Sequence, residues 1–325
     1  MHITNTKPII GLAPMDGITD SPFRWITDIY GKPDIIYTEF VSVKGLILGK
    51  PAIQRMLLHH KTKTTTIAQF FGCEPEYFYQ AALMALEKGF DGVDVNMGCP
   101  DKSVFRRGGG AGLILQPKLA KKIILSVKKA IKEGIKKFKI KKNITVSVKT
   151  RTGYKTPQTK EWISYLLEAR PDVICIHSRT FAQKYSGLAD WNQIGIAANL
   201  AKSTKTKIFG NGDIKNREQA LERIKEYDLA GVLIGRAALG NPWVFKGIIP
   251  TTEERFKVLL EHCKKFVKFF PSADLSIMRK HLAWYVKDFP HAAEVRNELM
   301  QVNSIEDVKK IISSIGKEKD QLGRF

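Results

Sequence analysis

The stretch Asp94-Val95-Asn96-Met97-Gly98-Cys99-Pro100 ends a short apolar run with an asparagine and a cysteine, and it closes the fourth of eight similar units. Gly98 allows close backbone approach, and Pro100 stops the strand. The following loop is cationic and flexible, with Lys102, Arg106, Arg107 and Gly108-Gly109-Gly110. A lone cysteine is most often an inert, buried small hydrophobe, and this is the alternative interpretation of Cys99. The surrounding loop favours a reactive thiol instead.

Seven further apolar runs flank that stretch, and segments with helical spacing separate them. The expected strands cover residues 9–13, 34–38, 64–70, 91–96, 144–148, 173–176, 207–209 and 231–234. One expected helix begins at Ser21, and the others cover residues 43–58, 76–88, 117–132, 162–168, 191–200 and 217–227. Near-continuous apolar strands alternating with helices predict a parallel sheet closed into a (β/α)8 TIM barrel. A doubly wound open sheet is the alternative, but the first strand lacks a G-x-G-x-x-G turn.

From about residue 250 the pattern changes to helices alone. Helical apolar spacing covers residues 253–270, 273–287, 292–301 and 305–315, with interruptions at Pro250, Pro271 and Pro290. We therefore expect a barrel domain over 1–247 and a small all-helical domain over 248–325. In the second of these helices the cations Arg279, Lys280 and Lys287 alternate with aromatic residues, so they are candidates for phosphate contacts. Core packing is the simpler interpretation of Trp284.

The chain of 325 residues carries a formal net charge of +21, which favours a polyanionic partner. Much of the excess lies in Lys121–Lys142, with ten lysines and one glutamate, and the simpler interpretation of this segment is a solvated helix face. The four cysteines include no C-x-x-C pair, so neither a metal site nor a disulfide framework is expected. No stretch is typical of a membrane span or a signal peptide, so we expect a cytoplasmic protein.

Polar residues follow or end most of the expected strands, which is where barrels of this kind carry their chemistry. They are Pro14, Glu39, Gln69, Asn96, Lys149, His177, Asn211 and Arg236. Each alone can be a turn residue, a cap or a core histidine, but together they form a ring of convergent polar groups. Gly210–Asp213 and Gly235-Arg236 follow the last two strands, and their small residues suit a phosphate held by backbone N–H groups.

Several stretches resemble the tRNA-dihydrouridine synthase family, flavin enzymes that reduce uridine in tRNA. The resemblance covers nearly the full length. It rests on Ala13-Pro14-Met15-Asp16-Gly17-Ile18-Thr19-Asp20, Tyr37-Thr38-Glu39-Phe40, Asn96-Met97-Gly98-Cys99-Pro100, His177-Ser178-Arg179-Thr180, Tyr185-Ser186-Gly187-Leu188-Ala189-Asp190-Trp191, Gly210-Asn211-Gly212-Asp213-Ile214, Ile234-Gly235-Arg236 and Met278-Arg279-Lys280-His281-Leu282-Ala283-Trp284-Tyr285. The cysteine loop together with the R-K-H-x-x-W-Y helix makes the resemblance specific.

The resemblance implies an FMN cofactor across the barrel mouth and NADPH, or NADH, as reductant. The flavin ring would lie on Pro14 and Met15, with Gln69 near its pyrimidine edge, Lys149 near N1 and His177 beside it. The phosphate would be held by Asn211, Gly212, Asp213, Gly235 and Arg236. A cation near N1 also makes physical sense, because it stabilises the negative charge of reduced flavin.

For the substrate, the resemblance implies hydride transfer from FMN to C6 of uracil and proton transfer from Cys99 to C5. Asn96 would contact the uracil, and the target's phosphates would lie near Lys102, Arg106, Arg107 and Arg179. The helical domain, with Arg279 and Lys280, would grip the tRNA, whose target base must be flipped out. No stable protein partner is implied, and we expect a monomer.

Some residues depart from the family's pattern: Ser178 stands where glycine is common, Phe181 where a second basic residue is common, and Gly108–Gly112 is unusually rich in glycine. These departures concern the loops that would face RNA. Two other functions stay open at this point. One is a flavin barrel that reduces a free pyrimidine, and the other is a non-catalytic RNA-binding module on a retained barrel.

Overall fold

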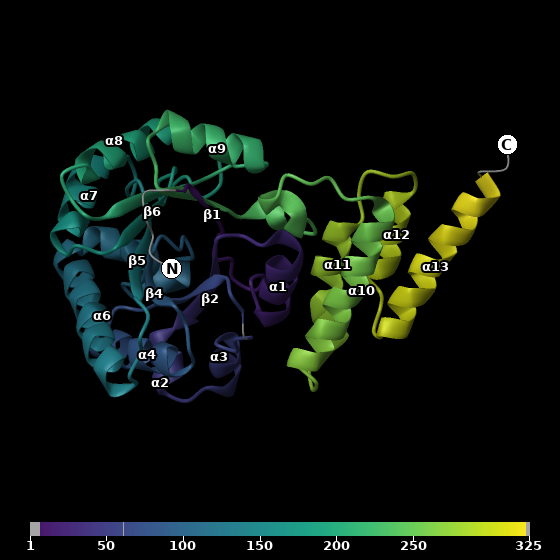
Figure 1. Cartoon of the computed structure of the whole chain (residues 1–325), viewed down its shortest axis with the longest axis horizontal. Helices are drawn as coiled ribbons and strands as arrows, with labels where there is room; N and C mark the ends of the chain where they lie inside the picture. The colour runs from purple at the N-terminus through teal and green to yellow at the C-terminus, as the bar shows by residue number, and fades with distance from the viewer. Residues whose placement is uncertain (1–6, 61, 323–325) are drawn as a thin grey trace.

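The computed structural model describes residues 7–60 and 62–322, with side chains described as far as Ile315. The two expected domain ranges are therefore described over 7–247, with residue 61 left out, and over 248–322. Figure 1 shows a ring of strands and helices with a group of helices beside it. No helix within the described residues is long and apolar enough to cross a membrane.

Eight parallel strands form a closed barrel in chain order, and the last strand pairs with the first. The strands are β1 (Ile9–Leu12), β2 (Ile35–Ser42), β3 (Thr65–Phe71), β4 (Gly92–Met97), β5 (Thr145–Arg151), β6 (Val173–His177), β7 (Lys207–Asn211) and β8 (Gly231–Ile234). The prediction of a (β/α)8 barrel is confirmed, and the doubly wound alternative is wrong because the sheet has no open edge.

Helices join successive strands around the outside of the ring. They are α1 (Ser21–Ile26), α2 (Val43–Ile47), α3 (Pro51–Met56), α4 (Pro75–Glu87), α5 (Lys102–Arg106), α6 (Pro117–Lys137), α7 (Thr159–Glu168), α8 (Trp191–Ala201) and α9 (Arg217–Glu226). Short turns of tighter helix cover Gly110–Leu115, Arg236–Ala238 and Pro242–Phe245.

Three elements differ from the sequence prediction. The expected helix over 43–58 is two helices, because Gly49 adopts a positive φ of 68° and Pro51 begins the second one. β2 continues to Ser42, so Glu39 lies inside the strand and not at its end. β5 continues to Arg151, two residues beyond Lys149.

Strand side chains alternate between two cores, as the period of a strand requires. Ile9, Tyr37, Cys175, Phe209 and Leu233 point into the barrel and form a small inner core. The alternate residues pack outward against the helices in a larger core. The barrel interior is therefore filled by side chains, which leaves the strand ends as the place for a binding site.

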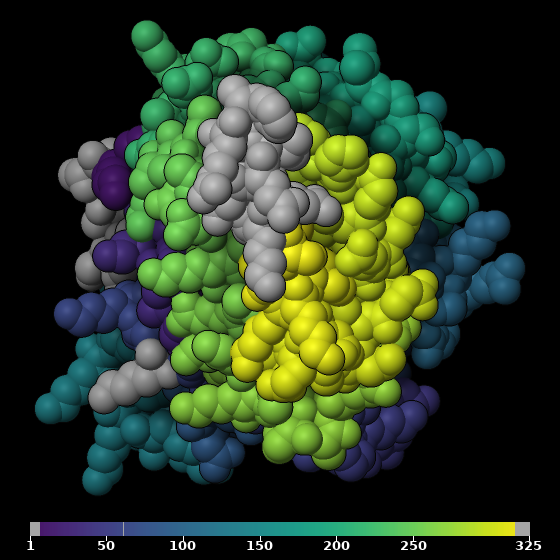
Figure 2. Space-filling view, turned by 90° about the vertical axis from the view of Figure 1, so that its right-hand side faces the viewer, coloured from purple at the N-terminus to yellow at the C-terminus, as the bar shows by residue number. Residues whose placement is uncertain are grey.

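The C-terminal helices are α10 (Thr252–Phe269), α11 (Arg279–Tyr285), α12 (Ala292–Leu299) and α13 (Ile305–Leu322), with a short helical turn at Leu275–Met278. The expected helix over 273–287 begins as that short turn, which the Asp274 side chain caps, and continues directly into α11. Seen from their own side, these helices lie in front of the barrel (Figure 2). Their core also contains Ile26 and Trp243, so it continues into the barrel segment.

Gly240, in the connection between barrel and helices, tests this junction. Gly240 has a φ of 60°, and an added Cβ would lie 2.2 Å from the carbonyl oxygen of Trp284. Gly89 has a φ of 86° with no atom within 4 Å of the added Cβ, so it is a matched control. We expect Gly89→Ala to lower the free energy of unfolding by about 1 kcal/mol and Gly240→Ala by at least about 3 kcal/mol. Equal losses in denaturant unfolding would contradict a close approach at Trp284.

Candidate active site

The carboxyl ends of the strands surround a cavity of about 950 Å³. Most of the site residues expected from the sequence line it: Pro14, Met15, Asn96, Cys99, Lys102, Lys149, His177, Asn211, Gly212, Asp213, Gly235 and Arg236. They come from six segments that are far apart in the chain, and barrel closure brings them to one mouth. Gln69 and Glu39 do not line the cavity.

The ends of β7 and β8 form one wall of the cavity and leave backbone donors unused. The N–H groups of Gly212, Asp213, Gly235 and Arg236 donate to no described residue. The Asp213 carboxylate accepts a hydrogen bond of 2.6 Å from Arg236, and hydrogen bonds from Arg179 lower its pKa. Free N–H groups beside an arginine held in place suit a phosphate.

Two nitrogen-bearing side chains in the cavity have no partner within the described chain. No described residue accepts a hydrogen bond from the Lys149 ammonium, and the buried Nδ1 of His177 is also unpaired. Burial lowers the pKa of both groups, so His177 is neutral at pH 7. The His177 side chain is buried and that of Lys149 is half-buried. Unpaired polar groups in such places are costly, so these two groups fit a polar ligand with an anionic edge.

Beneath the cavity, a chain of buried hydrogen bonds leads from Asp94 to Cys99. The Asp94 carboxylate accepts from Gln69 Nε2 at 2.7 Å and from Ser147 Oγ at 2.5 Å. Gln69 Oε1 then accepts from Asn96 Nδ2 at 2.9 Å. Asn96 Oδ1 accepts from the backbone N–H of Gly98 at 3.0 Å and from that of Cys99 at 2.8 Å. Each amide orientation is thus set by its neighbour, and the last one positions the cysteine loop.

Burial of these hydrogen-bonded side chains changes the pKa of Asp94, and the hydrogen bonds engage the Gln69 amide. Burial raises the pKa of Asp94 to about 7, although hydrogen bonds from Ser147 and Gln69 oppose the shift. Both polar ends of the Gln69 amide are engaged, and its side chain is fully buried. Gln69 therefore lies one layer below the cavity lining in this structure.

Cys99 lies at the edge of the cavity and is only 7 % exposed. Burial raises the pKa of its thiol, and the nearby carboxylates of Asp101 and Asp16 act in the same direction. The thiol is therefore protonated at neutral pH. A protonated thiol can donate a proton to a bound substrate but is a weak nucleophile.

Arg151 is a site residue that the sequence reasoning missed. Its guanidinium donates to the carbonyl oxygens of Gly98 at 2.7 Å and Lys184 at 2.8 Å, so it ties the cysteine loop to the loop after β6. Its centre lies 5.7 Å from the ring of Tyr185, which is also in the cavity wall. The strand period of two puts Arg151 on the same face as Lys149, and this signal could have identified it.

Other predicted substrate residues lie outside the cavity lining. Arg106 and Arg107 are exposed on and just after α5 near the mouth. Arg179 is 3 % exposed and paired with Asp213 at 2.6 Å. Arg279 donates to the carbonyl oxygen of Val302, and Lys280 donates to that of Gly17. These bonds use only some of the N–H donors of the last three residues, so their predicted phosphate contacts stay predictions.

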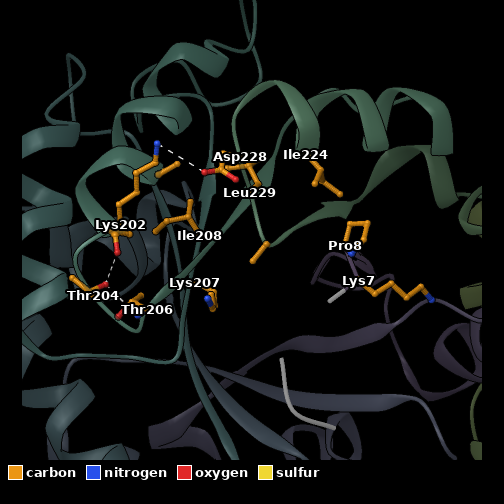
Figure 3. A pocket seen from close by; sticks show the side chains of 13 residues that line it. Lys7, Pro8, Lys202, Thr204, Thr206, Lys207, Ile208, Ile224, Asp228 and Leu229 are labelled. Atoms are coloured by element: carbon orange, nitrogen blue, oxygen red, sulfur yellow. Dashed lines mark hydrogen bonds and ion pairs between the residues drawn. The ribbon is translucent and has the colours of Figure 1, made fainter. Parts of the chain in front are cut away.

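A second cavity, of about 430 Å³, lies at the opposite ends of the strands (Figure 3). Its wall includes Lys7, Lys202, Lys207 and Asp228, and the Lys202 ammonium lies 3.9 Å from the Asp228 carboxylate. The hydroxyl groups of Thr204 and Thr206 are already bonded to backbone carbonyl oxygens. Barrels of this kind carry stability and not chemistry at this end, and we assign no site here.

A TIM barrel with unused backbone N–H groups at the ends of β7 and β8, a phosphate-type cradle, and a protonated cysteine at its mouth has the features of a barrel enzyme. A family model described as dihydrouridine synthase matches residues 11–319. A probable tRNA-dihydrouridine synthase 1 from Synechocystis sp. is 32% identical over 313 residues, covering 92% of this chain and 84% of the relative. A probable tRNA-dihydrouridine synthase from Staphylococcus aureus (strain COL) is 30% identical, covering 97% and 95%. The chain therefore belongs to the dihydrouridine synthase family.

Among solved structures, the old yellow enzyme homologue from Zymomonas mobilis is similar at a TM-score of 0.48 and 14% identity, covering 72% of this chain and 86% of that chain. Morphinone reductase in complex with tetrahydroNAD is similar at a TM-score of 0.47 and 12% identity, covering 73% and 85%. These likenesses are too distant to bear on the site.

The buried chain below Cys99 can be tested at Asp94. Asp94→Ala leaves Gln69 Nε2 and Ser147 Oγ without an acceptor, so we expect a loss of about 2–4 kcal/mol of stability. Asp94→Asn keeps one acceptor and is the matched control, with less than half that loss. Because burial raises the pKa of Asp94 from 3.8 to about 7, the wild type should lose stability relative to Asp94→Asn as pH rises from about 4 to 7. A stability difference that is constant across this range in denaturant unfolding would contradict the raised pKa.

Proposed function

We propose that this protein reduces specific uridines in tRNA to 5,6-dihydrouridine, with FMN as cofactor and NADPH, or NADH, as reductant. One observation carries the proposal: a buried, protonated cysteine faces the same cavity as an unpaired lysine and a phosphate-type cradle. Family membership supplies the reaction class. The net charge of +21 suits a polyanionic substrate.

For the cofactor, we assign the ring to Pro14, Met15, Lys149 and His177, and the phosphate to Asn211, Gly212, Asp213, Gly235 and Arg236. The unused N–H groups and the unpaired Lys149 and His177 nitrogens support this fit. When bound, reduced flavin supplies the hydride for C6 of uracil. Lys149 would stabilise negative charge at the ring edge, and the predicted pyrimidine-edge contact of Gln69 stays a prediction, since its amide is engaged.

Cys99 is the proposed acid that delivers a proton to C5 of uracil, which completes addition of one hydride and one proton across the C5–C6 bond. Its raised pKa keeps the proton in place until transfer. Asn96 holds the Cys99 N–H and still has one amide N–H unused, which we assign to the uracil. Lys102, Arg106 and Arg107 are the proposed contacts for the flanking phosphates of the flipped nucleotide.

We propose that residues 1–247 form the catalytic domain and that residues 248–325 contact the body of the tRNA. The four cysteines of the described chain are unpaired thiols, which supports a reducing compartment such as the cytoplasm. We propose that the protein acts as a monomer.

The Cys99→Ala variant tests the proposed function, with Cys73→Ala as the matched control because Cys73 is half-buried and outside the cavity. We expect Cys99→Ala to keep bound flavin and NADPH oxidation but to form dihydrouridine at least about 100-fold more slowly, because the proton donor is lost. The substrate would be tRNA from cells that lack the gene, and mass spectrometry of this tRNA after incubation with each variant would measure the product. Unimpaired product formation would contradict the acid role, whereas reduction of free uracil as readily as tRNA would favour the small-molecule alternative.

The lysine-rich helix α6 allows a separate test of the charge argument. Lys121 and Lys128 in this helix, and Lys142 after it, donate hydrogen bonds to other parts of the barrel domain. Lys122, Lys129 and Lys132 are exposed along the helix. If these three contact phosphates, replacing them with glutamine should reduce the slope of log affinity for tRNA against log salt by about 2–3. An equal triple change at Lys160, Lys205 and Lys225 is the control. An unchanged slope would leave α6 as a solvated face.

A further inference from the structure

The loop between β1 and α1 carries part of the cavity wall and has an unusual tip. Pro14, Met15 and Asp16 line the cavity. The base of the loop is closed by Thr19, whose Oγ1 is 3.1 Å from both the backbone nitrogen and the carbonyl oxygen of Met15. Gly17 forms the tip with a φ of 62°, a conformation that favours glycine.

The tip peptide is held from both sides by groups that belong to different parts of the chain. Glu39 in β2 accepts from the Gly17 N–H at 2.8 Å. Lys280 in α11 donates from its ammonium to the Gly17 carbonyl oxygen. The same ammonium interacts favourably with the carboxylates of Asp16 in the loop and Asp20, which caps α1. Lys280 is thus the polar link from the helical region to this loop.

The neighbours of Lys280 anchor α11 in two other directions. Arg279 donates to the carbonyl oxygen of Val302 at 3.0 Å and to Asn303 Oδ1 at 2.8 Å, so it ties α11 to the segment before α13. The His281 ring lies 5.8 Å from the ring of Phe23 in α1. Three consecutive side chains therefore bind the C-terminal helices, the cavity loop and α1, which gives Lys280 a rigid base.

We propose that Lys280 is a positioning residue that couples the helical domain to the cofactor-bearing loop, and not primarily a phosphate contact. The inference rests on the proposed function, because it takes the ligand of this loop to be the flavin. It follows that the helical domain contributes to flavin binding without touching the flavin. An exposed hydrogen bond from a charged donor can be replaced in part by water, so the effect is moderate.

The test compares Lys280→Met with Lys280→Arg and with Lys264→Met. Lys264 is an exposed lysine of α10 that makes no hydrogen bond or ion pair with the described barrel residues. Titration of flavin-free protein with FMN should show affinity reduced about three- to tenfold in Lys280→Met. Lys280→Arg should recover most of that affinity, because arginine can donate to the same carbonyl oxygen, and Lys264→Met should match the wild type. The slope of tRNA affinity against salt, measured with saturating FMN, should be equal in all four proteins.

Hydrogen exchange gives a readout that does not depend on flavin. The N–H of Gly17 donates to Glu39, and those of Ile18 and Thr19 donate to Met15. These amides should exchange faster in Lys280→Met than in Lys264→Met. Equal exchange and equal FMN affinity, with a tRNA salt slope reduced by about 1, would overturn the proposal in favour of a phosphate contact. If the wild type binds no FMN but these amides still exchange faster in Lys280→Met than in Lys264→Met, the proposed function is overturned and the role of Lys280 in holding the loop stands.

Discussion

Pairing of β8 with β1 closes the barrel, and every feature of the site depends on this closure. Gly231 makes it possible, because a Cβ there would lie 2.5 Å from the carbonyl oxygen of Ile9. Closure leaves no free sheet edge and brings the carboxyl ends of all eight strands to one mouth. Residues as distant in the chain as Pro14, Cys99 and Arg236 therefore face one cavity.

Burial then supplies the chemistry at that mouth. Desolvation lowers the pKa of His177 and Lys149 and raises that of Asp94 and Cys99, so each group is moved towards its neutral form. A neutral thiol retains its proton, and an unpaired ammonium is ready for an anionic ligand edge. The hydrogen-bonded chain from Asp94 supports the cysteine loop from below, while Arg151 ties the same loop from the side.

Much of this could be predicted from the sequence, because apolar periodicity identifies strands and the barrel places their ends together. The lining residues Lys149, His177 and Asn211 followed from that rule alone. Side-chain partners could not be predicted, since they depend on residues distant in the chain. Gln69 is turned towards Asp94, and Lys280 reaches Gly17 from 263 positions away. The length of β5, and with it Arg151, was underestimated because polar residues at a strand end weaken the apolar signal.

The most direct test of the central account is a single-turnover experiment on the purified protein. Protein reduced anaerobically with NADPH is mixed with tRNA that lacks dihydrouridine, and the visible absorption of oxidised flavin is followed together with the product. The account predicts that the absorption returns as dihydrouridine forms, in equal amounts, and only slowly without tRNA. A protein that carries no flavin, or a reduced flavin that tRNA does not reoxidise, would contradict it.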